Sequence, residues 1–179
     1  MQQLSTIVSS LLILSKADAG KLDLNLESIE LSKLVDGICE DAAILASHSH
    51  LHLQKTIQAN LTIRGDRILL EKALQNLLSN AVKYNHPGGA VQFRLLDARG
   101  KIDLEISNTG AGIPEADRTR IFERFHRSDT SRSRETEGLG LGLNLALEII
   151  RAHGGTLHLR KSSDKVTCFS VELPKDARA

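Results

Sequence analysis

The sequence predicts an α+β domain in which a mainly antiparallel sheet packs against three helices, preceded by a separate N-terminal helix. Three segments after the first carry apolar residues at helical spacing, and pairs of short alternating stretches are joined by turn residues. The chain has 179 residues with 41% hydrophobic content, which suits one folded domain, alone or with a fragment of another. Because only 3% of the residues are aromatic, the core must consist mainly of Leu, Ile, Val and Ala.

The first half of the chain contains two of the expected helices. Residues 1–16 carry an apolar stripe at steps of three and four, and Gly20 is expected to end this helix. An extended stretch is expected at 22–26 and a helix at 29–48. Residues 52–66 alternate enough for two short strands around a turn at Asn60.

The second half begins with Asp66, a side chain suited to cap the next helix. Regular structure is then expected as a helix at 67–84, strands at 90–97 and 101–107 around a turn at Arg99–Gly100, a helix at 141–152, and strands at 156–161 and 166–173. Residues 115–137 are polar, with three apolar anchors: Ile121, Phe122 and Phe125.

Composition excludes several function classes. A formal net charge of +1 gives no basic field for nucleic acid. The two cysteines, Cys39 and Cys168, are far apart, so a zinc cage or a disulfide framework is not expected and both are interpreted as small apolar residues. No apolar run approaches the ~20 residues of a membrane span, so this piece is expected to be cytoplasmic. A membrane-bound parent protein is compatible with that.

The segment GLGLGL, residues 138–143, places three glycines just before a helix. Ordering a glycine on folding costs more backbone entropy than ordering another residue, so a purely structural role is unfavourable. The segment instead favours a close approach of backbone N–H groups to an anion at the helix start. The spacing does not match G-x-G-x-x-G, and no Gly-Lys-Ser/Thr follows, which excludes the two best-known phosphate motifs. Alone, the segment also fits a packing motif.

A second polar pattern lies upstream. Asn76, Asn80 and Lys83 are separated by four and three residues, so they share one face of an otherwise apolar helix. A solvated face is the alternative interpretation for any one of them. A second glycine turn, NTGAGIP at 108–114, follows a predicted strand. "HSHLH" at 48–52 is interpreted as exposed histidines near a helix end in preference to a metal site.

Together these segments resemble the catalytic ATP-binding domain of bacterial sensor histidine kinases, in the Bergerat-type ATPase superfamily. "NLLSNAVKY" is similar to the N box, "NTGAGIP" to the G1 box, "IFERFHR" to the F box and "GLGLGLNLALEIIRAHGG" to the G2 box. The resemblance covers about residues 21–179 and implies a two-layer α/β sandwich. The residues around the G1 and F boxes are most similar to those of metal-responsive sensor kinases. Residues 1–20 are similar to the end of the second dimerisation and phosphoacceptor helix, which implies a truncated helix.

The resemblance implies roles for the helix face. Asn80 would bind Mg²⁺ through its oxygen, Asn76 would contact the phosphates or Mg²⁺-bound water, and Lys83 would bind a phosphate. Tyr84 would flank the base or ribose, with plain packing as the alternative. Related ATPases that hydrolyse ATP carry Glu at the position of Asn76, and an amide cannot act as general base, which favours phosphoryl transfer.

The glycine turns and the segment between them, an ATP lid at about 114–137, would complete the ATP site. Asn108 replaces the family's Asp and would accept a hydrogen bond from adenine without charge, so we expect modest affinity. Around the base, the resemblance implies that Gly110 and Gly112 turn beneath it, Ile113 packs on it and Thr167 joins through water. In the lid, Phe122 and Phe125 would act as anchors, and Arg124 and Arg127 would reach the terminal phosphates.

The second glycine segment would contact the triphosphate through the backbone amides of Gly138, Gly140 and Gly142. Its leucines, Leu139, Leu141 and Leu143, would tie the loop to the core.

None of the seven histidines lies in the family's phosphoacceptor motif. The chain is therefore expected to act on a histidine of dimerisation helices that it lacks, followed by relay to a response-regulator receiver domain. The full-length protein would be a homodimer anchored in the bacterial inner membrane, and this fragment alone a monomer unable to autophosphorylate. Two alternatives stay open: a Bergerat-type anti-sigma serine kinase, and a non-catalytic nucleotide-binding or dimerisation module.

Overall fold

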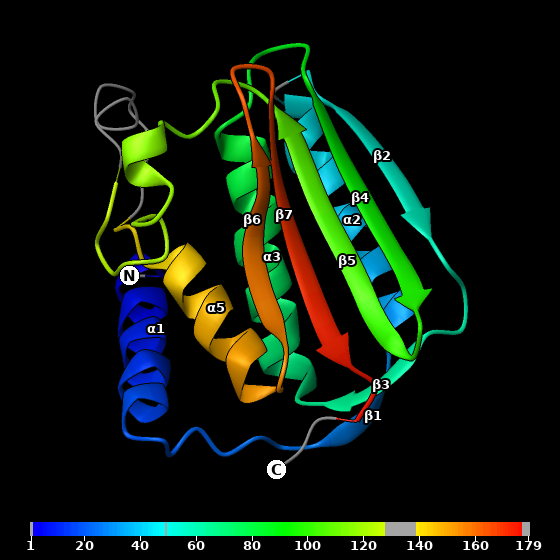
Figure 1. Cartoon of the computed structure of the whole chain (residues 1–179), viewed down its shortest axis with the longest axis vertical. Coiled ribbons are helices and arrows are strands. Elements are labelled where there is room, and N and C mark those ends of the chain that lie inside the picture. The colour runs from blue at the N-terminus through cyan, green and yellow to red at the C-terminus, as the bar shows by residue number, and fades with distance from the viewer. Residues whose placement is uncertain (1, 49, 128–138, 177–179) are drawn as a thin grey trace.

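A computed structural model describes residues 2–48, 50–127 and 139–176 of the chain (Figure 1). Its helices are α1 (Gln2–Asp18), α2 (Leu31–His48), α3 (Arg67–Lys83), the short 3₁₀ helix η1 (Glu115–Asp117) and α5 (Gly142–Ala152). Its strands are β1 (Glu27–Glu30), β2 (His52–Ile57), β3 (Thr62–Gly65), β4 (Ala90–Ala98), β5 (Lys101–Thr109), β6 (Thr156–Ser162) and β7 (Val166–Pro174).

Five strands form one sheet in the order β2-β4-β5-β7-β6. Only β2 and β4 run parallel, and the other neighbouring pairs are antiparallel. Helices α2, α3 and α5 cover one face of this sheet, and α1 stands apart beside α5 (Figure 1). The predicted α+β class, with a mixed, mostly antiparallel sheet against three helices and a further helix before them, is confirmed.

The core lies between the sheet and these helices. Alternate residues of β4, β5 and β7 are buried there, and α3 contributes a full apolar face: Leu69, Leu70, Ala73, Leu74, Leu77, Leu78 and Ala81. As the composition predicted, aliphatic side chains dominate, and Phe93 and Phe169 are the buried aromatic residues in the described part of the chain. Cys39 is buried, while Cys168 is half-buried, and both are free thiols.

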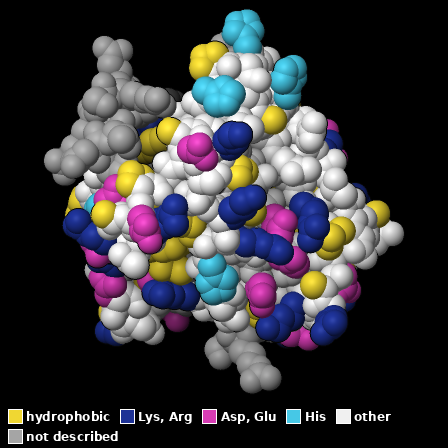
Figure 2. All heavy atoms as spheres, turned by 45° about the horizontal axis from the view of Figure 1, so that its top comes forward, with side chains coloured by type: hydrophobic (Ala, Val, Ile, Leu, Met, Phe, Trp, Pro, Cys, Tyr) yellow, Lys and Arg dark blue, Asp and Glu magenta, His cyan; other side chains and the backbone are white. Residues whose placement is uncertain are grey.

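The other face of the sheet carries charged side chains. Arg94 on β4 lies 3.8 Å from Asp103 and 3.6 Å from Glu105, both on β5, and Arg160 on β6 pairs with Glu105. Basic and acidic side chains are interspersed over the face shown in Figure 2, and histidines gather at its upper edge. The visible surface therefore offers no wide patch of a single charge.

Two details differ from the prediction for the first half of the chain. Residues 29 and 30 belong to strand β1 instead of the helix. In addition, β2 and β3 flank the expected turn at Asn60 but do not pair with each other. β3 pairs with β1 in a separate two-stranded sheet because Ile29 and Ile63, which lie opposite each other, are both buried.

The predicted helix boundaries and turns are otherwise confirmed. Asp66 caps α3 by accepting a hydrogen bond from the backbone N–H of Leu69 at 3.0 Å. Arg99 and Gly100 both have positive φ, as expected for a tight hairpin between β4 and β5. Within the described residues, no helix has the length and apolar character needed to cross a membrane.

His153 joins the end of α5 to the start of α3 through a buried ring. Its Nδ1 donates to the Ile149 carbonyl at 2.8 Å, and its Nε2 accepts from the backbone N–H of Asp66 at 2.9 Å. Nε2 must be unprotonated to accept, so the ring is neutral in the folded state. Burial lowers the pKa of His153 below its ordinary value, outweighing the opposing effects of the Ile149 hydrogen bond and the charge of Asp66.

This arrangement predicts a loss of stability in acid. Because the pKa of His153 is lower in the folded than in the unfolded chain, its contribution is complete above about pH 6.5 and is lost as the pH falls towards the folded value. We expect His153→Gln to lower the free energy of unfolding by about 1–3 kcal/mol at pH 7.5 and to flatten its decline between pH 7.5 and 5.5. Urea unfolding measures both effects.

His158, which is exposed on β6, provides the matched control, and His158→Gln should leave stability and its pH dependence unchanged. An identical acid decline in the His153 variant and the parent chain would show that another group is responsible.

Candidate active site

Asn76, Asn80 and Lys83 form a polar stripe on α3, beside its buried apolar face. Asn76 and Asn80 are half-buried, and the Nδ2 of Asn76 donates to the Lys72 carbonyl at 2.9 Å. The Oδ1 of Asn76 points to the first turn of α5, where a Cβ added to Gly142 would lie only 3.0 Å from it. Gly142 therefore allows α5 to begin directly against the polar stripe.

Asn80 lies one turn after Asn76 on the same face. No residue in the described part of the chain forms a hydrogen bond with its side chain. Its amide oxygen is therefore available as a neutral oxygen ligand, the type that Mg²⁺ accepts.

Lys83 and Tyr84 end the stripe. The Nζ of Lys83 lies 5.4 Å from the centre of the Tyr84 ring, and both side chains are half-buried. This geometry is a cation–π contact at the end of α3. The Tyr84 backbone turns away from the helix with φ −95° and ψ 19°, so the ring stands at the boundary between helix and loop.

Asn108 lies at the end of β5, beside the end of α3. The side chain is 5% exposed, and its Nδ2 donates to the Thr109 carbonyl at 2.8 Å and, more weakly, to the Tyr84 carbonyl at 3.5 Å. Both contacts use the nitrogen, which leaves the oxygen as the acceptor. Thr167 lies directly opposite on β7 and is also buried.

Asn85 and Thr109, which sequence reasoning missed, hold this corner together. The Thr109 hydroxyl donates to Asn85 Oδ1 at 2.7 Å and accepts from the backbone N–H of Ala90 at 2.8 Å. The Asn85 Nδ2 donates to the Ala90 carbonyl at 3.0 Å. The network joins the end of α3 to β4 and β5, and only the position of Asn85 after the helix could have indicated a capping role.

The first glycine turn follows Asn108. Gly110 has φ 141°, and a side chain there would collide with the Tyr84 carbonyl. Gly112 lies against the Ser163 carbonyl in the same way. Ile113 packs on the core, and its N–H donates to the hydroxyl of Ser162 at 2.7 Å. Both glycines thus stand where the backbone approaches another chain segment too closely for a Cβ.

Arg118 adds a contact that the sequence did not indicate. Its Nε donates to the Ile113 carbonyl and its Nη2 to the Ser162 carbonyl, both at 3.1 Å. Although exposed, it fastens the beginning of the lid region to the turn between β6 and β7.

The two phenylalanines expected to anchor the lid are placed differently. The Phe122 ring meets that of Phe169 edge to face, with 6.3 Å between ring centres. The Phe125 side chain is 60% exposed, so the prediction that it anchors the lid is wrong. Its φ of 60° turns the ring outward, and the contact is made instead by its backbone N–H, which donates to the Gly140 carbonyl at 3.1 Å.

The two arginines of this region differ. Arg124 pairs with Asp18 of α1 through two nitrogens and donates to Asn144 of α5 through the third. Arg127 is half-buried and already engaged in an interaction. The structure does not direct Arg124 towards the stripe on α3.

The second glycine segment is described from Leu139 onward, and Gly138 lies outside the described residues. Gly140 has φ 71° and approaches the His126 carbonyl, where an added Cβ would be 2.6 Å away. Leu141 is buried and Leu143 packs on the core, as predicted. Leu139 is 48% exposed, so it does not tie the loop to the core, because the backbone at this point already faces outward.

The described residues contain no group of three His, Cys, Asp or Glu side chains placed to hold a metal ion.

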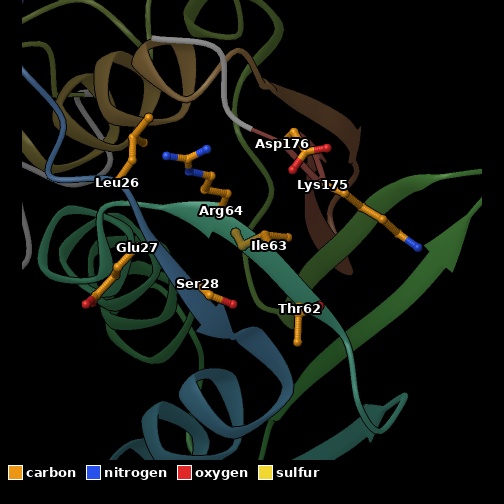
Figure 3. Close-up of a pocket in the computed structure, with 8 residues that line it drawn as sticks. All are labelled: Leu26, Glu27, Ser28, Thr62, Ile63, Arg64, Lys175 and Asp176. Atoms are coloured by element: carbon orange, nitrogen blue, oxygen red, sulfur yellow. The ribbon is translucent and has the colours of Figure 1, made fainter.

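A separate groove of about 470 Å³ lies on the two-stranded sheet, at the opposite end of α3 (Figure 3). The Lys175 side chain points away from it and its Nζ lies 2.6 Å from Asp97. The groove thus offers no converging set of reactive groups. Its lining residues are Leu26, Glu27, Ser28, Thr62, Ile63, Arg64, Lys175 and Asp176.

Comparison with known proteins identifies the family of the chain. Residues 65–177 match the family model described as histidine kinase-, DNA gyrase B-, and HSP90-like ATPase. The chain is 34% identical over 175 residues to the probable sensor histidine kinase TcrY of Mycobacterium tuberculosis, covering 98% of this chain and 36% of TcrY. It is 33% identical to the heme sensor protein HssS of Staphylococcus aureus, covering 98% of this chain and 37% of HssS. The chain therefore spans little more than a third of these two relatives.

A solved structure of the mycobacterial sensor histidine kinase MprB superposes with a TM-score of 0.72 at 29% identity, covering 85% of this chain and all of that one. Full-length ShkA in complex with AMPPNP superposes with a TM-score of 0.82 over 99% of this chain and 37% of ShkA, at 24% identity, and so supports the fold. The chain belongs to the histidine kinase-, DNA gyrase B- and HSP90-like ATPase family, as an ATP-binding catalytic domain of the sensor histidine kinase type.

Proposed function

We propose that this domain binds Mg²⁺–ATP along the polar stripe of α3 and transfers the γ-phosphoryl group to a histidine on a dimerisation domain outside this chain. One observation carries the proposal: the two ends of the stripe meet the two glycine turns. Asn76 faces Gly142, and the Tyr84 carbonyl faces Gly110. A nucleotide lying along α3 would thus have its base near Asn108 and its phosphates near the start of α5.

Asn108 supports base recognition. Because its nitrogen already donates to two backbone carbonyls, the oxygen is free to accept from the exocyclic amino group of adenine. Gly110, Gly112 and Ile113 would form the floor under the base, and Thr167 would join through water.

The phosphate end combines neutral and positive groups. We propose that Asn76 and Arg127 contact the terminal phosphates together with the backbone amides of the second glycine segment. Lys83, which lies two turns along α3 towards the base, would reach a phosphate nearer the ribose with its long side chain. Asn80 would hold Mg²⁺ through its free amide oxygen, and the ion would neutralise phosphate charge when bound. The residues present fit such an ion, since an uncharged oxygen on a half-buried helix face can coordinate it without a buried carboxylate.

Asn76 favours transfer to a protein over hydrolysis. Its amide has no proton acceptor of useful basicity, and its nitrogen is engaged with the Lys72 carbonyl. Water placed against the terminal phosphate would therefore lack a general base at this position.

The partners follow from α1 and from the relatives. We propose that residues 1–20 belong to the dimerisation and phosphoacceptor helices and residues 21–179 to the catalytic domain, with a lid at about 114–137. Val8, Leu11 and Leu12 on α1 are 49%, 40% and 58% exposed and would pack against the other helices of a homodimer. ThkA, a structural neighbour, has been solved with the response regulator protein TrrA, and we propose an equivalent relay for an inner-membrane parent protein.

The assignment of Asn80 as a Mg²⁺ ligand predicts that Asn80→Ala weakens nucleotide binding only when Mg²⁺ is present. Removing the only proposed protein ligand should weaken the Mg²⁺-dependent binding of a non-hydrolysable ATP analogue roughly tenfold and leave binding without Mg²⁺ unchanged. Calorimetry with and without Mg²⁺ measures the difference. Ser79→Ala, an exposed neighbour on the same helix, is the control, and equal losses in both variants would refute the role of Asn80.

The assignment of Asn108 to the adenine base predicts that Asn108→Ala discriminates less well between adenine and guanine nucleotides. Without the acceptor oxygen, affinity for the ATP analogue should fall roughly five- to tenfold, and preference over the matching GTP analogue should shrink. Competition binding reports both values. Ser107→Ala changes the neighbouring residue on the other face of β5 and should alter neither.

The transfer itself can be measured by adding a separately produced phosphoacceptor helix pair and γ-labelled ATP. The parent chain should label the histidine of that pair, and Asn80→Ala should reduce labelling to background. Tight ATP binding with no labelling would favour a non-catalytic nucleotide-binding module, and absence of binding at millimolar ligand would exclude both kinase interpretations.

A further inference from the structure

We propose that His126 and Asp117 are positioning residues for phosphate recognition, because their contact holds the backbone against which the second glycine segment turns into α5. The inference rests on the proposed function, in which the phosphates of the nucleotide lie near the start of α5. It gives the short 3₁₀ helix η1 a part in shaping that end of the site.

Gly140 lies directly against the backbone of Phe125 and His126. The N–H of Phe125 donates to the Gly140 carbonyl at 3.1 Å, and a Cβ added to Gly140 would lie 2.6 Å from the His126 carbonyl. Two residues later, Gly142 lies against the amide oxygen of Asn76. The glycine segment therefore contacts the Phe125–His126 backbone at one glycine and the polar stripe of α3 at the next.

The contact with Phe125 also sets the direction of a backbone amide. The peptide between Gly140 and Leu141 is trans, so the Leu141 N–H points away from Phe125, opposite to the bonded carbonyl. No residue in the described part of the chain accepts a hydrogen bond from this N–H, and the amides that follow begin α5, where a helix leaves its first N–H groups without intrahelical acceptors. These are donors that the proposed function offers to the phosphates, so a shift of Phe125 would redirect them.

The ring of His126 anchors this backbone to η1. Its side chain is 8% exposed, and its Nε2 lies 3.3 Å from Asp117 Oδ1. The nitrogen is buried and receives no hydrogen bond from the residues that the structure describes, so its attraction to the carboxylate is the interaction that offsets its burial. An ionised carboxylate can only accept, which means that Nε2 carries a proton in this arrangement.

Asp117 can serve as an anchor because its own backbone is fixed. Its N–H donates to the Pro114 carbonyl at 2.9 Å, and its carbonyl accepts from the N–H groups of Arg120 and Ile121 at 2.8 and 2.9 Å. Arg118, the next residue, fastens the same stretch to the turn between β6 and β7. The carboxylate therefore projects from a backbone that is held on both sides.

The pair joins the two ends of the proposed nucleotide site. η1 follows the first glycine turn, at the base end, and His126 supports the second glycine segment, at the phosphate end. Loss of the pair should loosen the amides offered to the phosphates and leave the acceptor oxygen of Asn108 in place. The effect should therefore appear with a phosphorylated ligand and not with adenosine.

The test measures the affinities of a non-hydrolysable ATP analogue and of adenosine, each with Mg²⁺, by calorimetry and competition binding on the full chain. His126→Leu and Asp117→Asn should each weaken binding of the ATP analogue roughly three- to tenfold and leave adenosine binding unchanged. The double variant should lose no more than the larger single loss, because both changes remove one contact. His126→Gln, which keeps a donor for Asp117, should restore affinity to within about twofold of the parent chain.

Glu115→Gln is the matched control, since it removes an exposed acidic side chain from the same 3₁₀ helix and should change neither affinity. Asp117→Asn keeps the test decisive if His126→Leu disturbs the fold, because it preserves the size of the side chain. Equal losses for adenosine and the ATP analogue would reduce the pair to general structural support. An undiminished affinity in Asp117→Asn, or no rescue by His126→Gln, would also overturn the positioning role, whereas failure of the parent chain to bind any nucleotide would overturn the proposed function and this role with it.

Discussion

The burial of one face of α3 against the five-stranded sheet is the constraint on which the site depends. Seven apolar side chains fix the rotation of the helix about its axis, and that rotation decides where the polar stripe points. Asn76 and Asn80 then lie along the edge of the buried face, with Asn76 against the start of α5. The amides are thus oriented by packing at positions that bind no ligand themselves.

The two glycine turns allow backbone segments to lie close to the ends of the polar stripe on α3. The end of β5 comes so close to the last turn of α3 that Gly110 can carry no side chain, and the first turn of α5 also lies close to Asn76, at Gly142. The Asn85–Thr109 hydrogen bond holds the first of these approaches in place. Backbone groups therefore converge on the stripe from both ends, as expected of a site that recognises a ligand through main-chain atoms.

The sequence predicted the elements that have a single strong periodicity, and it failed where two patterns overlapped. The periodicity of α3 and α5 and the hairpin at Arg99–Gly100 were sufficient to place them. Ile29 fits both the apolar face of a helix and an alternating strand, and only pairing with Ile63 selects β1. The glycine and amide positions could be predicted because they are local motifs. The exposure of Phe125 and Leu139 and the contact between Arg124 and Asp18, which are 106 residues apart in the chain, depend on the tertiary arrangement.

The short β1–β3 ladder has a mechanical consequence. β1 follows α1 after eight residues, and β3 leads directly into Asp66 and α3. Asn25, between α1 and β1, donates its backbone N–H to Asp66 Oδ2 at 3.0 Å, while Arg64 is joined to Lys175 near the end of the chain. Because the pair is antiparallel with Glu27 opposite Gly65, a force between α1 and α3 would enter and leave the ladder at the same end and open its hydrogen bonds one after another. Displacement of the first helix would therefore separate β1 from β3 stepwise, beginning beside the foot of α3.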